Sequence, residues 1–289
     1  MNAPAPVTTP CVAELLAAAR RAGVDRLDAQ LLLARLLQRP RAWLIAHDDH
    51  RVDTAQADTF ARQLAERARG QPLAYLLGER EFHGLTLQVT PDVLVPRPDT
   101  EVLVDWALEL LATAARRHPP AAAPPTVADL GTGSGAIALA VKHACPQARV
   151  SAVDLSAAAC AVARANGQRL GLDVEWLQGD WFAPLAGRRF DLLVSNPPYI
   201  GADDPHMADL HAEPQTALSP GVDGLAALRK LCAGAPAHLQ PGGWLLVEHG
   251  FDQGGAVRSL FEAARFAQVT TRRDLAGHER CTGGCGPVP

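Results

Sequence analysis

The residues best suited to chemistry are Asn196, Pro197, Pro198 and Tyr199, which follow an apolar run over residues 190–194. Two consecutive prolines have no backbone N–H group, so they cannot continue a sheet ladder. The Asn196 amide and the nearby carbonyl groups supply hydrogen-bond acceptors, and the Tyr199 ring supplies a flat apolar wall. This arrangement is suited to holding a planar –NH2 group while an electrophile approaches it. A plain proline turn is the alternative, and it leaves the position of the motif at the end of a strand unexplained.

A second motif, formed by Gly131, Thr132, Gly133, Ser134 and Gly135, joins a short apolar strand to a helix. Glycines let the backbone turn tightly and approach a ligand closely. An acidic residue ends the next expected strand, where a carboxylate can accept hydrogen bonds from both ribose hydroxyls of a nucleoside. That residue is Asp154. A glycine turn with a helix-capping acid is the alternative interpretation, and the pattern does not by itself separate NAD from S-adenosylmethionine.

Asp180 and Trp181 follow the third expected strand. The acid could accept a hydrogen bond from an adenine amino group, and the indole could cover the ring face. Alone, the pair is equally well explained as a turn acid and a core tryptophan. The carboxyl ends of parallel strands meet at one edge of a sheet, however, and ligands bind in the crevice there. The sequence therefore predicts that all these residues surround one crevice.

The expected elements place these motifs in the second of two domains. Residues 10–69 predict a small bundle of three or more helices, with caps at Thr9-Pro10, Asp25 and Asp53. Residues 71–98 suggest a hairpin and a linker, in which Pro98 begins a further helix. From residue 126 apolar strands alternate with helices, which indicates a doubly wound α/β sheet covered on both faces. We predict domains at 1–90 and 91–289.

The composition excludes several other classes of protein. The 289 residues are 48% hydrophobic and 20% charged, as in a globular protein, and the net charge of −4 gives no general attraction to nucleic acid. No run has the length of a membrane span, and no secretory signal is visible. The six cysteines are scattered in a chain long enough to form a core without disulfides, so a reducing cytoplasm is expected.

Other potentially reactive residues form no site that the sequence supports. His278, Cys281 and Cys285 lie near an end expected to fray, and they match no closed tetrahedral zinc pattern, so no metal is predicted. His249 ends an expected strand at the same edge as the crevice, and it receives no role. No Gly-x-Ser-x-Gly elbow or Cys/His arrangement indicates covalent catalysis.

Seven segments in one order resemble the HemK/PrmC family, the protein-(glutamine-N5) methyltransferases that act on peptide chain release factors. The resemblance covers nearly the whole chain and includes both motifs. It departs from the family only at the linker PPAAAPP (119–125) and at the ending CTGGCGPVP, neither of which is expected to touch the site. The segments are GQPLAYLLGEREFHGL (70–85), VLVPRPDTEVLVDWAL (93–108), DLGTGSGAIALA (129–140), SNPPYI (195–200), EPQTALSPGVDGL (213–225), LLVEHG (245–250) and RDLAGHER (273–280).

The resemblance implies a class I, Rossmann-like methyltransferase domain that uses S-adenosylmethionine and releases S-adenosylhomocysteine. It implies that residues 195–200 hold the glutamine of a Gly-Gly-Gln loop, that the helical domain helps bind the release factor, and that loops around 96–101 and 201–222 border the groove. The implied cofactor-binding residues are Gly131, Thr132, Gly133, Ser134, Gly135, Asp154, Asp180, Trp181 and Asn196. The implied substrate-binding residues are Asn196, Pro197, Pro198 and Tyr199.

The chemistry expected of this slot is alignment. An amide nitrogen is a weak nucleophile because its lone pair is delocalised, whereas a sulfonium methyl group is already strongly electrophilic. We assign the Asn196 side-chain oxygen and the Pro197 carbonyl as acceptors of the two amide hydrogens, and Tyr199 as the wall of the slot. Asn196, Pro197 and Tyr199 are thus the expected catalytic residues, and no general base is required.

Three other functions are compatible with parts of the pattern. An adenine-N6 nucleic-acid methyltransferase would also present a planar amino group, but it normally needs a basic face and a means of extracting the base. A non-catalytic nucleotide-binding scaffold would not need both motifs intact. A dinucleotide oxidoreductase would leave residues 196–199 unexplained. We expect a protein partner, no direct contact with nucleic acid or membrane, and a monomer.

Overall fold

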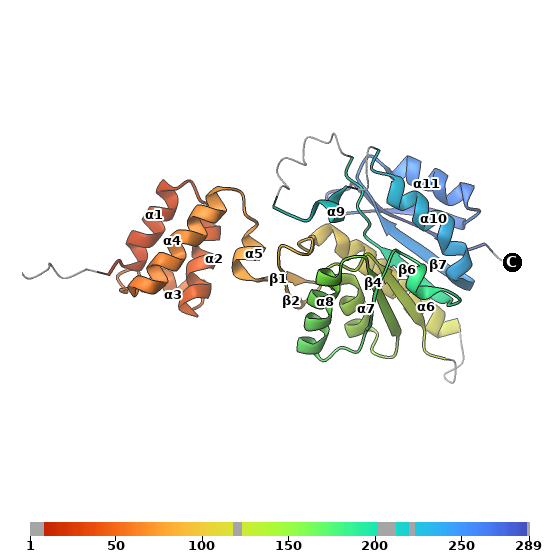
Figure 1. The fold of residues 1–289 in the computed structure, drawn as a ribbon, viewed down its shortest axis with the longest axis horizontal. Coiled ribbons are helices and arrows are strands. Elements are labelled where there is room, and N and C mark those ends of the chain that lie inside the picture. The colour runs from red at the N-terminus through yellow and green to blue at the C-terminus, as the bar shows by residue number, and fades with distance from the viewer. Residues whose placement is uncertain (1–8, 118–122, 202–211, 220–222, 288–289) are drawn as a thin grey trace, which may run out of the picture. The chain divides into compact units, whose positions relative to one another are not determined.

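The computed structural model describes residues 9–117, 123–201, 212–219 and 223–287 (Figure 1). The chain divides into two units, Met1–Gly78 and Glu79–Pro289. Each unit has its own apolar core.

The first unit is a helical bundle whose core includes the fully buried Val12, Leu33 and Phe60. The three expected helices are present, and two short helices are added because Pro40 and Pro72 each occupy an N-cap position and begin a new turn. Among the described residues, the helices of this unit are α1 (Val12–Arg21), α2 (Arg26–Leu37), α3 (Arg41–Ala46), α4 (Thr54–Ala68) and α5 (Leu73–Leu77).

The helix caps follow the sequence in two of three cases. Asp25 accepts hydrogen bonds from the N–H groups of Leu27 and Asp28, and Asp53 accepts one from Gln56. The cap predicted at Thr9-Pro10 is wrong, because α1 begins after Cys11. The Glu14 carboxylate there accepts from the Cys11 N–H group at 2.8 Å, so the side chain of the third helical residue replaces a cap side chain.

We expect Asp25→Ala to loosen α2 locally. Losing an N-cap acceptor costs about 1 kcal/mol, equivalent to about fivefold faster hydrogen exchange if opening is local. Amide exchange of the full chain, read over α2 by mass spectrometry, measures this change. Asp58→Ala, at an exposed mid-helix position of α4, is the matched control and should leave exchange unchanged. Equal exchange of α2 in both variants would contradict the assigned cap.

The predicted hairpin is confirmed as β1 (Glu79–Phe82) and β2 (Leu85–Gln88), which pair antiparallel with Phe82 opposite Leu85. His83 and Gly84 form the turn and both have positive φ. Phe82, Leu85 and Leu87 belong to the core of the second unit. The hairpin therefore lies in the larger unit, whereas the predicted boundary at residue 90 places it with the helices.

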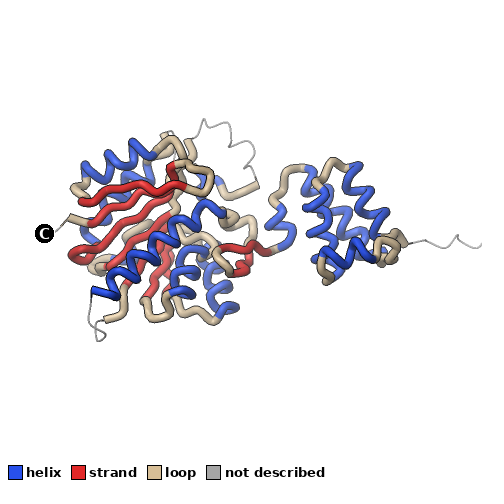
Figure 2. The backbone as a smooth tube through the Cα atoms, turned by 180° about the vertical axis from the view of Figure 1, so that it is seen from behind, coloured by secondary structure: helices blue, strands red, loops and turns tan. Residues whose placement is uncertain are grey.

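The second unit is a seven-stranded sheet with helices on both faces (Figure 2). The strand order is β5-β4-β3-β6-β7-β9-β8, and the first five strands are parallel. Alternate residues of β3 point to opposite faces, with Val127 in the core under α6 and α7 and Ala128 in the core under α10 and α11. The strands are β3 (Thr126–Leu130), β4 (Arg149–Asp154), β5 (Glu175–Gln178), β6 (Phe190–Ser195), β7 (Leu239–Glu248), β8 (Ala267–Arg273) and β9 (Glu279–Cys285).

Helices connect these strands and cover the sheet. The long helix α6 starts directly after a short 3-10 turn, η1 (Pro98–Thr100), in which Pro98 takes the first position as predicted. The described helices of this unit are α6 (Glu101–Arg117), α7 (Ala136–Ala144), α8 (Ala157–Leu170), η2 (Ala183–Leu185), α9 (Gln215–Leu218), α10 (Ala226–His238) and α11 (Gly254–Ala263). In the described part of the chain, no helix has the length and apolarity needed to cross a bilayer.

The end of the chain differs from the sequence prediction. The segment expected to fray is β9, an interior strand that pairs antiparallel with both β7 and β8. A Cβ atom on Gly283 would lie 2.3 Å from Leu246 and 2.8 Å from Trp106, so glycine is needed for the sheet and its covering side chains to pack closely. Gly284 is packed in the same way, since its Cβ atom would lie 3.0 Å from both Phe261 and Phe266.

Candidate active site

A cavity of about 530 Å³ lies at the carboxyl edge of the parallel strands. Residues from η1, from the loops after β3, β4, β5 and β6, and from the segment around α9 line it. Most residues predicted from the sequence are brought together here: Gly131, Thr132, Gly133, Ser134, Asp154, Asp180, Trp181, Asn196 and Pro198. Of the other predicted residues, Gly135, Pro197 and Tyr199 are not among its described lining residues.

The glycine turn has a backbone conformation that favours glycine, and a hydrogen bond to the Asp154 carboxylate holds it in place. Gly131, Gly133 and Gly135 all have positive φ, the region that favours glycine. The Asp154 carboxylate accepts hydrogen bonds from the Gly133 N–H group at 2.8 Å and from the Ser156 N–H group at 2.9 Å. A carboxylate can accept about four hydrogen bonds, so Asp154 can also accept from two ligand hydroxyls.

A buried acid beneath this turn was not assigned a role from the sequence. Asp129 is the second-to-last residue of β3, and one of its carboxyl oxygens accepts from the Thr132 hydroxyl at 2.6 Å and from the Ala138 N–H group at 3.2 Å. Burial raises the pKa of Asp129 to about 7. Its other oxygen has no hydrogen-bond partner in the described part of the chain. Asp129 thus ties the turn to the start of α7.

The Trp181 side chain packs against the protein, whereas the Asp180 side chain is open to solvent. Trp181 has a positive φ of 46°, and a Cβ atom on Gly131 would lie 3.4 Å from its indole, so the ring packs against the glycine turn. The Asp180 side chain is 59% exposed at the cavity, 3.9 Å from the Lys230 ammonium group. The indole thus forms a wall, and the carboxylate remains accessible.

The Asn-Pro-Pro-Tyr segment is held by several hydrogen bonds. The Asn196 Nδ2 group donates to the Thr100 hydroxyl at 3.1 Å, and the Tyr199 hydroxyl donates to Glu248 at 3.1 Å. The Tyr199 backbone carbonyl accepts from the Gln253 side chain at 2.9 Å. Burial, followed by the charge of Glu248, raises the pKa of Tyr199, so the phenol stays protonated. Glu248 was not singled out in the sequence, although it ends a strand at the same edge as Asp154.

The rim of the cavity joins two distant segments. Buried Glu213 accepts from the Val95 N–H group at 3.1 Å and forms an ion pair with Arg97. This contact links the segment before η1 to the segment before α9, and Arg97 and Pro214 both line the cavity. The expectation that residues 201–222 border the groove is met for these described residues, whereas 202–211 and 220–222 lie outside the described part.

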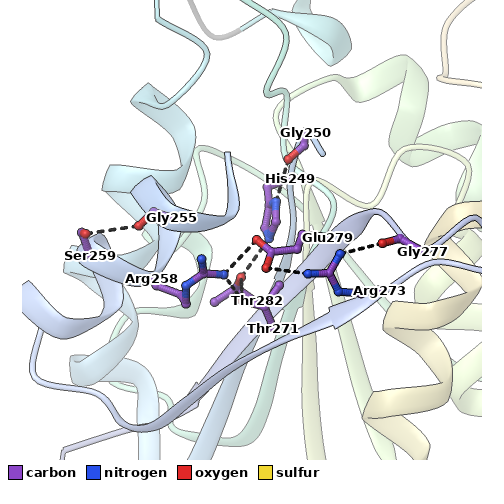
Figure 3. Close-up of polar contacts among 10 residues, drawn as sticks. All are labelled: His249, Gly250, Gly255, Arg258, Ser259, Thr271, Arg273, Gly277, Glu279 and Thr282. Atoms are coloured by element: carbon purple, nitrogen blue, oxygen red, sulfur yellow. Dashed lines mark hydrogen bonds and ion pairs between the residues drawn. The ribbon is translucent and has the colours of Figure 1, made fainter. Parts of the chain in front are cut away.

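His249 follows β7 and is not among the described lining residues of the cavity; Figure 3 shows its polar contacts. Its Nδ1 group donates to the Gly250 carbonyl at 2.9 Å, so Nε2 accepts from the Thr282 hydroxyl at 2.8 Å. Thr282 is followed by Thr271 and Arg258 in the same chain of hydrogen bonds. Burial lowers the pKa of His249, which suits this neutral form. This row of hydrogen bonds stiffens the turn after β7. In that turn the Gln253 side chain accepts from the Gly250 N–H group and donates to the Tyr199 carbonyl.

The thiols near the end of the chain are packing residues. Cys281 is fully buried on β9 opposite Glu248, and burial raises its pKa. None of residues 281–287, the described part of this ending, is among the lining residues of the cavity. In residues 9–117, 123–201, 212–219 and 223–287, no three acidic, histidine or cysteine side chains could together hold a metal ion.

This architecture defines a class of enzyme. A parallel sheet whose final strand is inserted antiparallel, with a glycine turn after β3 and an acid at the end of β4, is that of the class I methyltransferases that use S-adenosylmethionine. The family described as "Methyltransferase small domain" matches residues 101–271, and the "PrmC N-terminal domain" matches residues 12–78. The 16S rRNA N2 G1207 methyltransferase of T. thermophilus, solved with AdoMet and guanosine, has the same fold at a TM-score of 0.52 and 21% identity, covering 72% of this chain and 50% of that one.

Curated relatives identify the particular family. The release factor glutamine methyltransferase of Bordetella pertussis is 52% identical over 265 residues, or 91% of this chain and 95% of the relative. That of Xylella fastidiosa is 49% identical over 279 residues, or 96% and 98%. The chain belongs to the release factor glutamine methyltransferase family.

Proposed function

We propose that this protein transfers a methyl group from S-adenosylmethionine to the side-chain nitrogen of the glutamine in the Gly-Gly-Gln motif of peptide chain release factors. One observation carries the proposal: Asn196 and Pro198 line the same cavity as the glycine turn and Asp154. The residues proposed to bind the amide therefore line the same cavity as the turn proposed to bind the nucleoside, which supports the transfer of a methyl group between them.

The residues of the cavity fit the methyl donor. Gly133 lines the cavity and has open space where a side chain would begin, which allows close approach of a ligand to the backbone. The spare acceptor capacity of Asp154 suits two ribose hydroxyls, and the Trp181 indole suits an adenine face. The open Asp180 carboxylate is available for the adenine amino group. When bound, the cofactor supplies an electrophilic methyl group.

The part left to the protein is to orient the glutamine amide. We assign the Asn196 Oδ1 atom and the Pro197 carbonyl as acceptors of its two hydrogens, with Pro198 and Tyr199 shaping the slot. Two fixed acceptors orient the nitrogen and favour the electron-rich form that attacks. Fixed alignment contributes roughly 7–11 kcal/mol in favourable cases. The nitrogen loses one of its two hydrogens as a proton to solvent after the methyl group has been transferred, so no general base is required.

The helical unit is proposed to help bind the release factor by shape and apolar contact. Its apolar surface includes Leu27 and Ile45, which are 45% and 68% exposed. We further propose that the protein acts in the cytoplasm as a monomer and without direct contact with nucleic acid or membrane.

Mass spectrometry tests the function directly. A bacterial release factor incubated with the protein and S-adenosylmethionine is expected to gain one methyl group, mapped by fragmentation to the glutamine of its Gly-Gly-Gln loop. No gain by a protein that binds S-adenosylhomocysteine would refute the acceptor, and methylation of adenine in nucleic acid would be assayed next.

A further inference from the structure

The wall behind the Asn-Pro-Pro-Tyr segment contains a buried carboxyl group that the proposed mechanism does not use. Glu248, the last residue of β7, is 1% exposed and accepts a hydrogen bond from the Tyr199 hydroxyl at 3.1 Å. Its Oε2 atom has no hydrogen-bond partner in the described part of the chain. A buried acid is costly to the fold, so its presence beside a candidate active site points to a function.

Thr100 connects this carboxyl group to the proposed catalytic amide. Its hydroxyl, on a side chain that is 4% exposed, accepts from the Asn196 Nδ2 group at 3.1 Å. A hydroxyl has one hydrogen to donate besides its lone pairs. Glu248 is the carboxyl group beside it: Ser195 pairs with Val247, so Asn196 and Glu248 follow at neighbouring positions after β6 and at the end of β7, and the Thr100 side chain lowers the pKa of Glu248. The three side chains come from η1, from the end of β6 and from the end of β7.

We propose that Glu248 and Thr100 are positioning residues that determine which end of the Asn196 amide faces the substrate. This inference rests on the proposed function. The Glu248 carboxylate accepts the Thr100 hydrogen, the Thr100 oxygen accepts from Nδ2, and Oδ1 is left to face the cavity. A reversed amide would present an –NH2 group to the –NH2 group of the glutamine, and the slot would lose one acceptor.

The charge of Glu248 should control this arrangement. Burial raises the pKa of Glu248 to about 7, whereas Thr100, Tyr199 and Arg280 lower it and Asp99 raises it again. Arg280 is paired with Asp99 at 3.3 Å and stays charged. A protonated Glu248 has lost its negative charge and is a weaker acceptor for the hydroxyl groups beside it. The arrangement is therefore strongest above about pH 7 and weakens as the pH falls through that value.

Selective labelling allows Asn196 to be observed directly. The sequence contains only three asparagines, Asn2, Asn166 and Asn196, so 15N-asparagine labelling gives three side-chain amide signals, assigned with Asn196→Ala. We expect the Asn196 signal to titrate with a midpoint of about 7 in the unmodified protein and to stop titrating in Glu248→Gln. Asn166, buried and bonded to the Gln88 and Ser134 carbonyls, is the internal control.

Kinetics gives the second readout, using release factor and S-adenosylmethionine. Thr100→Val removes the acceptor for Nδ2 and should lower kcat by about tenfold, the equivalent of one lost hydrogen bond, with KM for the methyl donor unchanged. Thr100→Ser keeps the hydroxyl and should retain most of the activity. The acidic limb of the pH profile of kcat should disappear in Glu248→Gln.

Three results would overturn the inference: an Asn196 signal that does not titrate, full kcat in Thr100→Val, or an acidic limb that persists in Glu248→Gln. A persistent limb would belong to another buried acid such as Asp129, whose pKa is also about 7. The labelling experiment needs no substrate. A titrating Asn196 in a protein that does not methylate release factor would therefore refute the proposed function alone.

Discussion

Asn196→Ala is expected to lower kcat for release factor methylation by about 100-fold or more, as the loss of one preorganised hydrogen-bonding group in an active site does. The variant loses the acceptor assigned to one amide hydrogen of the glutamine. Affinity for S-adenosylhomocysteine should stay within about twofold, because the glycine turn and Asp154 are untouched. Single-turnover methylation followed by mass spectrometry measures the first quantity, and calorimetric titration measures the second.

The matched control for this variant is Gln240→Ala, which also removes a side-chain amide. Gln240 is exposed near the start of β7, at the end of the strand that lies away from Glu248. It should behave like the unmodified protein. Equal loss of methylation and of cofactor affinity in Asn196→Ala would contradict the assigned role, since Asn196 would then act mainly on the cofactor.

Asp154→Ala is expected to weaken binding of S-adenosylhomocysteine by about 10- to 100-fold, because hydrogen bonds to a charged group contribute about 1.5–3 kcal/mol. The carboxylate is lost both as the proposed partner of the ribose hydroxyls and as the acceptor that holds the Gly133 N–H group. Calorimetric titration of the full chain measures the affinity.

A comparison with Asp173→Ala, an exposed acid just before β5, separates this local effect from general loss of negative charge. That control should bind with unchanged affinity. Thermal unfolding without ligand should show both variants folded. Unchanged affinity in Asp154→Ala would mean that the carboxylate only shapes the loop, and the assigned contact with the nucleoside would be abandoned.

The sequence predicted the parallel half of the fold because its signals are local. The apolar strands, the glycine turn and the Asp25 cap each depend on a few neighbouring residues. The antiparallel end was missed because β9 contains Gly283 and Gly284, which are unusual in a strand. Glycine is needed at these positions because Trp106, Leu246 and Phe261, from distant parts of the chain, pack directly against them.

The same distinction applies to the site. Asn196 and Asp154 could be found because their motifs are contiguous and each ends an apolar run. Thr100, Glu213 and Glu248 could not be assigned roles, because each acts through a contact formed only on folding. The position of Glu248 at the end of a strand was the one local signal, and an isolated acid at a strand end is too common to interpret.

The insertion of β9 between β7 and β8 has a consequence for how the chain folds as it is synthesised. The bundle has its own apolar core and is complete within Met1–Gly78, so it can fold as soon as these residues have been made. The sheet has no continuous interior until residues 279–285 have been made, because β7 and β8 are joined only through them. We therefore expect the strand edge of β7, and with it the environment of Glu248, to be the last part of the molecule to mature.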